Sequence, residues 1–377
     1  MKTSGIYIHI PFCTAKCIYC DFYSVAGQDD RIDTFVDSLV MEINNSDIDV
    51  TNWKFDTIFI GGGTPSLLNK IQLEKIIDAL SKKYDLSNII EFTMEANPGE
   101  APIDKLKDFH SLGVNRLSMG VQSIKSNLLS FLSRIHSAED AINTFNSARK
   151  AGFENINCDL IYNIPNQSLN DWRDDLRQLI DLNPEHISAY SLTVEQNTPL
   201  FGLVSSNSVK MPEDDIHLEF NSIAYEILKK NDFIQYEISN YSKLNKECFH
   251  NLHYWDNDTY LGFGSSAHSF DGKKRWNNYS SIDKYISRLK YDKSPIESYD
   301  EISEIDKINE IIGFGLRMTK GFKISRIPSI LKFKFKEQLK LSQIKYPGMI
   351  IEENMRIKLS QKGMAFADAI AVELLFS

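Results

Sequence analysis

Three cysteines lie within eight residues near the start of the chain, and their types and spacing are the first indication of chemistry. Cys13, Cys17 and Cys20 form a C-x3-C-x2-C pattern in a loop that Pro11 opens after an apolar run. Thiolates are the usual ligands of iron–sulfur clusters, and a short loop can wrap three of them around one cube. Three cysteines leave one of the irons of a [4Fe–4S] cube without a protein ligand. The pattern therefore predicts a [4Fe–4S] cluster with one iron open to a further ligand.

A structural zinc site and a chance grouping of buried thiols are the alternatives to a cluster. Structural zinc takes four ligands, usually from two cysteine pairs, whereas this chain has one run of three cysteines without a nearby second pair. His9 could complete such a set, so zinc stays open at this point. The other two cysteines differ: Cys158 lies inside an apolar run and is expected in the core, and Cys248 lies in an aromatic segment.

Glycine and polar motifs follow several other apolar runs of the sequence. A run of glycines at 61–63 would let the backbone approach a ligand closely and present its N–H groups. Glu95 follows the next run, and a carboxylate there suits a cationic ligand. Gln122, Arg134 and Asp159 follow later runs. The plain alternatives are a tight turn for the glycines and an ion pair or helix-flanking contact for Arg134 and Asp159.

The cysteine pattern, with the aromatic Tyr19 before the last cysteine, resembles that of the radical SAM superfamily. The string Tyr-Ile-His-Ile-Pro-Phe-Cys at residues 7–13 is similar to its oxygen-independent coproporphyrinogen III oxidase-like branch, and the resemblance extends over almost the whole chain. It implies that S-adenosylmethionine (SAM) binds the open iron, where an electron from the cluster can cleave it to a 5′-deoxyadenosyl radical. The cofactor-binding residues that it implies are Tyr7, Tyr19, Gly62, Gly63, Thr64, Glu95, Gln122, Arg134 and Asp159. The family often has glycine where this chain has Asn163, a residue that tolerates a left-handed backbone.

Short apolar runs alternate with helical patterns through the first two-thirds of the chain. The helical patterns are at Ile71–Lys83, Ala138–Ala151 and Leu169–Leu182, with Ser137 as an N-cap and Gly152 as a C-cap. Six β-α units in series predict a parallel sheet with helices outside, and six is too few for a closed eight-stranded barrel. The predicted fold is an α/β open partial (β/α)6 barrel of the radical SAM type, with ligands at the carboxyl ends of the strands. The predicted strands are Gly5–Ile10, Asp56–Gly61, Ile90–Glu95, Arg116–Gly120, Ile156–Tyr162 and His186–Tyr190.

The pattern changes after about residue 243. The segment Glu247–Phe270 is aromatic, and helical patterns follow at Lys307–Thr319, Lys332–Gln343 and Lys362–Leu375. These patterns predict a radical SAM domain at residues 1–243 and a smaller, mainly helical C-terminal domain at residues 244–377, which the resemblance likens to that of the oxidase branch.

Two functions occur in this branch, an oxidative decarboxylation of coproporphyrinogen III and a heme chaperone activity, and three features separate them. The oxidase has a fourth cysteine where this chain has Phe22. It also has a long N-terminal extension, whereas six residues precede Tyr7 here. The chaperones carry an H-N-x-x-Y-W motif, which this chain has in full from His250 to Trp255. The resemblance therefore favours a heme chaperone, with a radical SAM enzyme acting on coproporphyrinogen III or a related tetrapyrrole as the alternative.

The chemistry of this motif suits a porphyrin. A neutral imidazole such as that of His250 is a good axial ligand for heme iron, and Tyr254 and Trp255 offer flat apolar surfaces. Cys248 is an alternative ligand, and His253 and His268 are expected to be structural or surface residues. Without the resemblance, the motif is more typical of an aromatic interface that packs the C-terminal domain onto the barrel. Two further alternatives stay open: a pure interaction protein whose cluster is only structural and, more remotely, an RNA-modifying enzyme.

Composition narrows the classes of partner. Residues are 42% hydrophobic and 25% charged, and the net charge of −9 argues against a general nucleic-acid binder. The sequence lacks a stretch long and apolar enough to span a bilayer, and its first ten residues lack the apolar core of a signal peptide. We therefore expect a cytoplasmic protein, peripheral at the membrane through a partner at most. Its expected partners are heme, apo-hemoproteins such as membrane-bound respiratory enzymes, an electron donor to the cluster, and a second copy of the chain in a homodimer.

Overall fold

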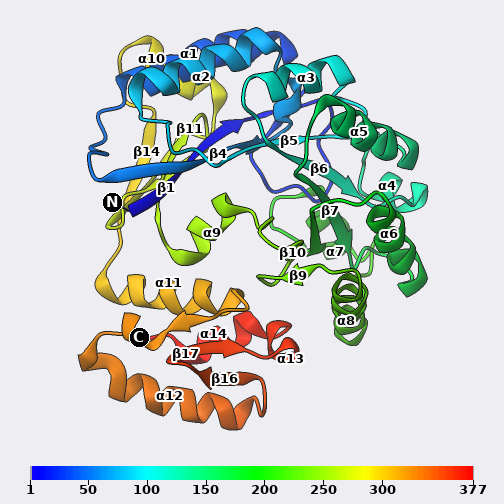
Figure 1. Cartoon of the computed structure of the whole chain (residues 1–377), viewed down its shortest axis with the longest axis vertical. Helices are drawn as coiled ribbons and strands as arrows, with labels where there is room; N and C mark the ends of the chain where they lie inside the picture. Colours follow the sequence, from blue (N-terminus) through cyan, green and yellow to red (C-terminus); the bar gives the residue numbers. More distant parts are fainter. Residues whose placement is uncertain (1, 377) are drawn as a thin grey trace.

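A computed structural model describes residues 2–376, and a parallel sheet forms its centre (Figure 1). Each predicted strand is present, and neighbouring strands of this set run parallel. Their side chains alternate between the sheet's two faces, and the outward-facing Ile, Leu, Phe and Met residues form the main hydrophobic core. In sheet order the central strands are β1 (Lys2–Ile10), β4 (Trp53–Gly62), β5 (Glu91–Ala96), β6 (Arg116–Gln122), β7 (Ile156–Tyr162) and β8 (His186–Ser191).

Helices cover the outer face of this sheet, as the alternating pattern predicts (Figure 1). The predicted caps of α5 are confirmed: the Ser137 hydroxyl accepts from the backbone N–H of Asp140, and Gly152 ends the helix at φ 106°. A left-handed φ of this kind favours glycine. The helices of this part of the chain are α1 (Ile32–Asn45), α2 (Lys70–Lys83), α3 (Ile103–Ser111), α4 (Ser126–Phe131), α5 (Ala138–Ala151), α6 (Leu169–Asp181), α7 (Pro199–Ser205) and α8 (Asp214–Lys230).

Further strands extend the sheet at both edges, and these were not predicted. β11 pairs in parallel with β1, and an antiparallel series continues outward from it. In the described residues 2–376 the sheet has twelve strands and ends at β14 on one side and β9 on the other, so the barrel is open as predicted. The added strands are β9 (Ile234–Gln235), β10 (Asn240–Ser242), β11 (Thr259–Phe263), β12 (His268–Phe270), β13 (Lys274–Asn278) and β14 (Ile296–Glu301).

The helix α9 (Phe249–Asp256) lies across the amino ends of β4 and β5. The Glu91 carboxylate, at the start of β5, accepts from the backbone N–H groups of Phe249 and His250 at 2.8 and 3.1 Å. A carboxylate at the first turn is favourable because it satisfies free N–H groups at the positive end of the helix. α9 therefore closes the end of the barrel opposite to the strand ends that carry the cysteine loop.

A second hydrophobic core lies in residues 308–376. Its helices are α11 (Glu304–Arg317), α12 (Lys332–Lys345), α13 (Gln361–Met364) and α14 (Ala367–Leu374), around a sheet of β15 (Phe322–Lys323), β16 (Ile350–Glu353) and β17 (Arg356–Leu359). We call residues 304–376 the C-terminal unit. The helix predicted at Lys362–Leu375 is two helices, because the backbone turns between Met364 and Ala367. The predicted domain boundary after residue 243 stays a prediction. α10 (Ile282–Lys290) and the strands before it pack against the main core.

Candidate functional site

The glycine motif forms the base on which the cysteine loop stands. The loop leaves β1, passes through β2 (Phe12–Cys13) and returns through β3 (Val25–Ala26). The backbone N–H groups of Gly63 and Thr64 donate to the carbonyls of Ile10 and Phe12 at 2.8 and 2.7 Å. A Cβ atom on Gly63 would lie 2.5 Å from the Phe12 carbonyl oxygen, so a side chain there would push the loop away. The sequence thus needs glycine at this position to hold the loop against the strand ends.

Cys13, Cys17 and Cys20 line one cavity of about 670 Å³ above the strand ends. Burial raises the pKa of the Cys13 thiol, and it raises the pKa of Cys20 to about 11, so iron would have to displace the protons of both. Among the described residues, no three His, Cys, Asp or Glu side chains converge closely enough to hold a single metal ion. A cubane cluster takes its thiolates on different irons, which keeps the sulfurs apart. The donor set, three thiols on one loop of which two are buried, therefore fits a cluster better than a single ion.

His9 does not supply the fourth ligand that a structural zinc site would need. Its Nδ1 lies 3.0 Å from the Tyr7 hydroxyl, and its Nε2 donates to the Tyr23 carbonyl at 2.9 Å. Burial lowers the pKa of His9 to about 4, so the ring is neutral. Both ring nitrogens are engaged in these bonds, which fix the loop to the strand instead of leaving a lone pair for a metal.

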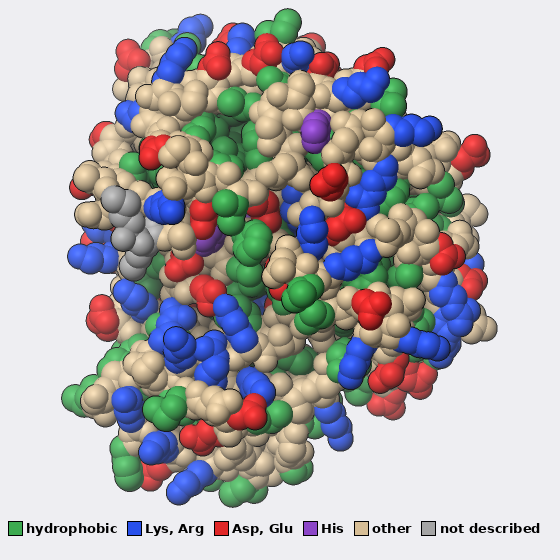
Figure 2. All heavy atoms as spheres, viewed as in Figure 1, with side chains coloured by type: hydrophobic (Ala, Val, Ile, Leu, Met, Phe, Trp, Pro, Cys, Tyr) green, Lys and Arg blue, Asp and Glu red, His purple; other side chains and the backbone are tan. Residues whose placement is uncertain are grey.

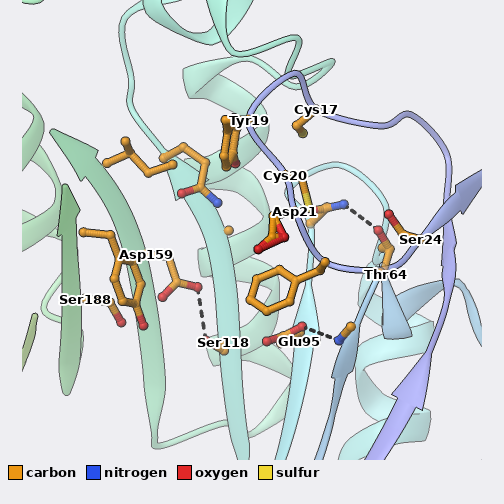
Figure 3. A pocket seen from close by; sticks show the side chains of 18 of the residues that line it. Cys17, Tyr19, Cys20, Asp21, Ser24, Thr64, Glu95, Ser118, Asp159 and Ser188 are labelled. Carbon is orange, nitrogen blue, oxygen red and sulfur yellow. Dashed lines mark hydrogen bonds between the residues drawn. The ribbon is translucent and has the colours of Figure 1, made fainter. Parts of the chain in front are cut away.

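Every sequence-predicted site residue lines this same cavity. Figure 3 shows Cys17, Tyr19 and Cys20 on the loop, with Glu95 on β5 and Asp159 on β7 directed into the space beneath it. The parallel strands bring these residues together because their carboxyl ends meet at one edge. The backbone of Asn163 has a φ of 65°, the left-handed conformation that its place in the family pattern requires. Gln122 has a φ of 65° as well, at the irregularity where β6 shifts register against β7.

Glu95 is a buried carboxyl group held at the side of the glycine motif. Its Oε2 accepts from the backbone N–H of Gly62 at 3.1 Å. Burial raises the pKa of Glu95 to about 8, and the negative charge of Asp159 contributes in the same direction. A buried carboxyl group of this kind gains most from a cationic partner, because a positive charge would offset the cost of ionising it.

Arg134 supplies a positive charge close to the cysteine loop. Its Nη2 donates to the Asn97 side-chain oxygen and the Gly120 carbonyl at 2.6 and 2.7 Å, and its Nη1 lies 3.6 Å from Cys17 Sγ. The guanidinium therefore lies directly beside one of the three cysteine sulfurs. Asn97 in turn donates to the Thr64 hydroxyl at 2.9 Å, joining two predicted site residues. Sequence reasoning missed Asn97, although it stands two residues after Glu95 in the same strand-end motif.

Asp159 was predicted as a site residue, but the polar side chains beside it on the same wall of the cavity were not. Its carboxylate accepts from Ser118 at 3.2 Å and from Asn157 at 2.8 Å, and burial raises its pKa. Arg116, which is 2% exposed, lines the cavity beside them. The alternation of inward and outward side chains along β6 and β7 could have predicted these neighbours. Residues 116, 118, 157 and 159 all point inward from these two adjacent strands.

His250 lies at the floor of this cavity, on α9. It is 1% exposed, and its Nδ1 and Nε2 lie 2.9 Å from the Thr57 hydroxyl and the Tyr254 hydroxyl respectively. Burial lowers its pKa, so the imidazole is neutral. A Cβ atom on Gly5 would lie 2.7 Å from the ring, so glycine makes room for it in β1. The Cys248 thiol is buried at 3.5 Å from Glu91 Oε1, and Asn251 and Tyr254 line the cavity with His250.

His253, the second histidine of α9, is a structural anchor, as expected. Its Nε2 lies 2.7 Å from the carboxylate of Asp56 and its Nδ1 lies 3.0 Å from that of Asp258. These carboxylates raise the pKa of His253 to about 9 against the opposing effect of burial. A positive imidazolium thus ties the helix to the starts of β4 and β11.

Comparison with known proteins places the chain in a family. Residues 7–179 match the model of the radical SAM superfamily. The heme chaperone HemW of Bacillus subtilis is 37% identical over 84% of this chain and 83% of its own. HemW of Lactococcus lactis is 31% identical over 98% of this chain and 96% of its own. The chain belongs to the HemW family of radical SAM proteins.

The similarity to HemW covers much more of the chain than the match to the radical SAM model does. Because the Lactococcus HemW alignment covers 98% of this chain, it takes in α9 and the C-terminal unit as well as the cysteine loop. The solved structure of coproporphyrinogen III oxidase (HemN) from Escherichia coli has a TM-score of 0.83, with 22% identity over 99% of this chain and 90% of that chain. This chain therefore has the same fold as HemN. Among the described residues there is no helix long and apolar enough to cross a membrane.

Proposed function

We propose that this protein is a heme chaperone that binds heme and delivers it to apo-hemoproteins, and that it carries a [4Fe–4S] cluster and SAM. Relatives named heme chaperone HemW support the proposal, at 37% identity for the Bacillus protein and 40% for the Escherichia coli protein. The observation that carries it is that the cysteine loop and the His250 helix bound one cavity, from its mouth and its floor. The cluster, SAM and heme would therefore share one cavity.

The mouth of the cavity suits the cluster and SAM. Cys13, Cys17 and Cys20 would hold the cluster, with the Arg134 guanidinium 3.6 Å from Cys17 Sγ. SAM bound to a reduced cluster supplies a 5′-deoxyadenosyl radical. The residues of the chain would orient it: the backbone at Gly62 and Gly63 leaves room for its amino-acid end, and Glu95 offers a carboxylate to its positive charge.

Heme ligation at His250 would require a rearrangement. Tyr254, one turn further along α9, lies 2.9 Å from the Nε2 atom that would face a ligand. The neutral imidazole has the protonation state that an iron ligand needs, and Thr57 at its Nδ1 would set the tautomer that leaves Nε2 free. Rotation of Tyr254 would therefore convert a hydrogen-bonded core histidine into a ligand.

The partners of this function follow from the same arrangement. The recipients would be apo-hemoproteins, including membrane-bound respiratory enzymes. An electron donor would approach the mouth of the cavity, where Cys20 is partly exposed and Phe22 beside it is 70% exposed. A homodimer would place two such mouths in one particle, and sedimentation of the reconstituted protein with and without SAM would test that state.

Heme titration of the anaerobically reconstituted protein, followed at the Soret band, tests the proposal. We expect a saturable band in the wild type, and a band that weakens or shifts in His250→Ala. Tyr254→Phe should bind heme at least as tightly as the wild type, because it frees Nε2 from its hydroxyl partner. His110→Ala, an exposed histidine on α3, is the matched control. If none of the four proteins gives a saturable band, the chaperone proposal is wrong.

A radical SAM oxidase is the second candidate, and the structural likeness to HemN favours it. Decarboxylation of coproporphyrinogen III at an enzymatic rate, on the order of 1 per second or more, would support it. Cys13→Ala should then abolish all turnover. Phe22 stands where the oxidase has its further cysteine, so we expect no turnover at such a rate.

A further inference from the structure

A helix of the C-terminal unit presents apolar side chains to solvent. On and just before α12, Ile330 is 89% exposed, Phe333 73%, Leu341 67% and Ile344 77%. The same helix buries Phe335 and Leu339 against the second core, so its inward face is already packed. Large apolar side chains scattered singly over a surface need no explanation, but a group on one helix face usually marks an interaction site.

The exposed apolar residues share one face of α12. At 100° per residue, Phe333, Leu341 and Ile344 fall within an arc of about 80° that lies opposite to Phe335 and Leu339. Ile330 precedes them by about one turn, in the short helix Ser329–Leu331. We call Ile330, Phe333, Leu341 and Ile344 the apolar stripe.

Lysines flank the apolar stripe on both sides. By the same geometry Lys336 and Lys340 lie along one edge, and Lys334 and Lys345 lie along the other. Residues 329–346 hold five lysines and one glutamate, a net charge of +4 in a chain whose total is −9. The glutamate, Glu337, lies within the stripe, and Lys345 also pairs with Glu373 on α14 at 2.6 Å. The local charge stays strongly positive despite these two carboxylates.

The helix lies at the outer edge of the molecule. In Figure 1, α12 forms the lower border of the C-terminal unit, with α14 and the small sheet between it and α11. Figure 2 shows Lys and Arg side chains interspersed with hydrophobic ones over this lower region. A convex ridge with apolar side chains at its crest and lysines along its flanks fits a flat partner, because every crest residue can enter the same layer.

We infer that α12 docks the protein on the surface of an anionic lipid bilayer. The apolar stripe would enter the boundary between headgroups and acyl chains, and the flanking lysines would extend their stems to reach the anionic headgroups. An acidic protein would satisfy the lysines, but it would need a groove matched to the stripe. Docking through α12 leaves the barrel on the far side of the C-terminal unit, so the cavity stays open to solvent.

Co-sedimentation of the full-length reconstituted protein with vesicles tests this inference. We expect binding to vesicles rich in phosphatidylglycerol and little binding to pure phosphatidylcholine vesicles, with a loss of about tenfold or more between 0.1 and 0.5 M NaCl. The double variant Phe333→Ser/Ile344→Ser and the double variant Lys336→Glu/Lys340→Glu should each weaken the partition by about tenfold or more. These residues are exposed, so both variants should fold.

Ile71→Ser, at an isoleucine that is 66% exposed on α2 of the barrel, is the matched control and should bind vesicles like the wild type. Equal binding by both double variants and the wild type would overturn the inference. So would an absence of binding to anionic vesicles, which is the result expected if the ridge serves an acidic protein. Heme titration of the same variants should match the wild type, so a failure of the chaperone proposal would be distinguishable from a failure of lipid docking.

Discussion

Glu95 and Asp159 place two carboxyl groups in one cavity, where the charge of Asp159 disfavours the ionisation of Glu95. Burial is the larger cause of the raised pKa of Glu95, about 8, and the charge of Asp159 adds to it. Near neutral pH Glu95 is therefore mostly protonated while the cavity holds no cation. A positively charged ligand would stabilise the ionised form, so its binding should release a proton.

This titration predicts a pH dependence of SAM binding. An acid whose pKa is raised to about 8 carries its charge only above that pH, so the affinity for SAM should rise between pH 6.5 and 8 and then level off. Glu95→Gln, which keeps the shape and loses the charge, should weaken binding by roughly tenfold at pH 8 and flatten the profile. Calorimetric titration of the reconstituted protein in two buffers would measure both effects. Equal slopes in the wild type and the variant would contradict this role of Glu95.

At the scale of elements, α9 is held to the barrel by charge as well as by packing. His253, with its side chain 7% exposed, bridges Asp56 and Asp258 from two different strand starts. Its pKa in the folded protein is about 9, above the ordinary 6.5 of the unfolded chain. The stabilisation is therefore fully present below pH 6.5 and is lost as the pH rises through 9.

The free energy of unfolding should reflect this anchor. His253→Gln should destabilise the protein by roughly 2–3 kcal/mol at pH 6, because it leaves two partly buried carboxylates without their cation. The difference between wild type and variant should shrink toward pH 9.5. Urea unfolding at pH 6, 7.5 and 9.5 would measure it, with His110→Gln as an exposed control on α3. A difference that is constant over this range would show that His253 acts through packing alone.

The elements that the sequence predicted are those with a strong local pattern. The central strands are apolar runs ended by glycine or asparagine, and α5 has its capping serine and terminal glycine, Ser137 and Gly152. The strands β9 and β10 have two and three residues, too few to show alternation, and the antiparallel β12–β14 depend on pairing with neighbours rather than on their own composition. The break near Ala365 was missed because the apolar pattern continues through it.

At the scale of the whole molecule, the candidate site could be assembled from sequence because parallel strands bring their ends to one edge. Cys13 and Asp159 are far apart in the chain, yet both line the same cavity. The position of His250 could not be predicted in this way. It depends on α9 crossing the opposite end of the barrel, which in turn rests on Glu91 and Asp56, residues that lack any local signature. Contacts between buried residues that are far apart in the sequence cannot be predicted from local sequence patterns.

The C-terminal unit contacts the barrel at several places, among them the Glu237–Met318 bridge and the Arg275–Glu310 ion pair. The last residue of the H-N-x-x-Y-W motif makes a further contact, between α9 and α11. The ring centroids of Trp255 and Phe314 lie 6.1 Å apart, and the guanidinium of Arg317 lies 5.0 Å from the centre of the Trp255 ring. The next residue, Asp256, pairs with Lys320 at 2.9 Å. One short helix therefore carries His250 toward the cavity and Trp255 toward the C-terminal unit.

Loss of the Trp255 ring should uncouple the two cores. We expect wild-type protein to unfold in one calorimetric transition, and Trp255→Ala to lose roughly 2–3 kcal/mol and to separate a lower transition for the C-terminal unit. Trp255→Phe keeps a ring beside Phe314 and Arg317 and should restore much of the cooperativity. A single transition that only shifts in Trp255→Ala would mean that the remaining contacts suffice to join the cores. Two transitions would instead show that the Trp255 ring couples the C-terminal unit to the barrel and to the helix that carries His250.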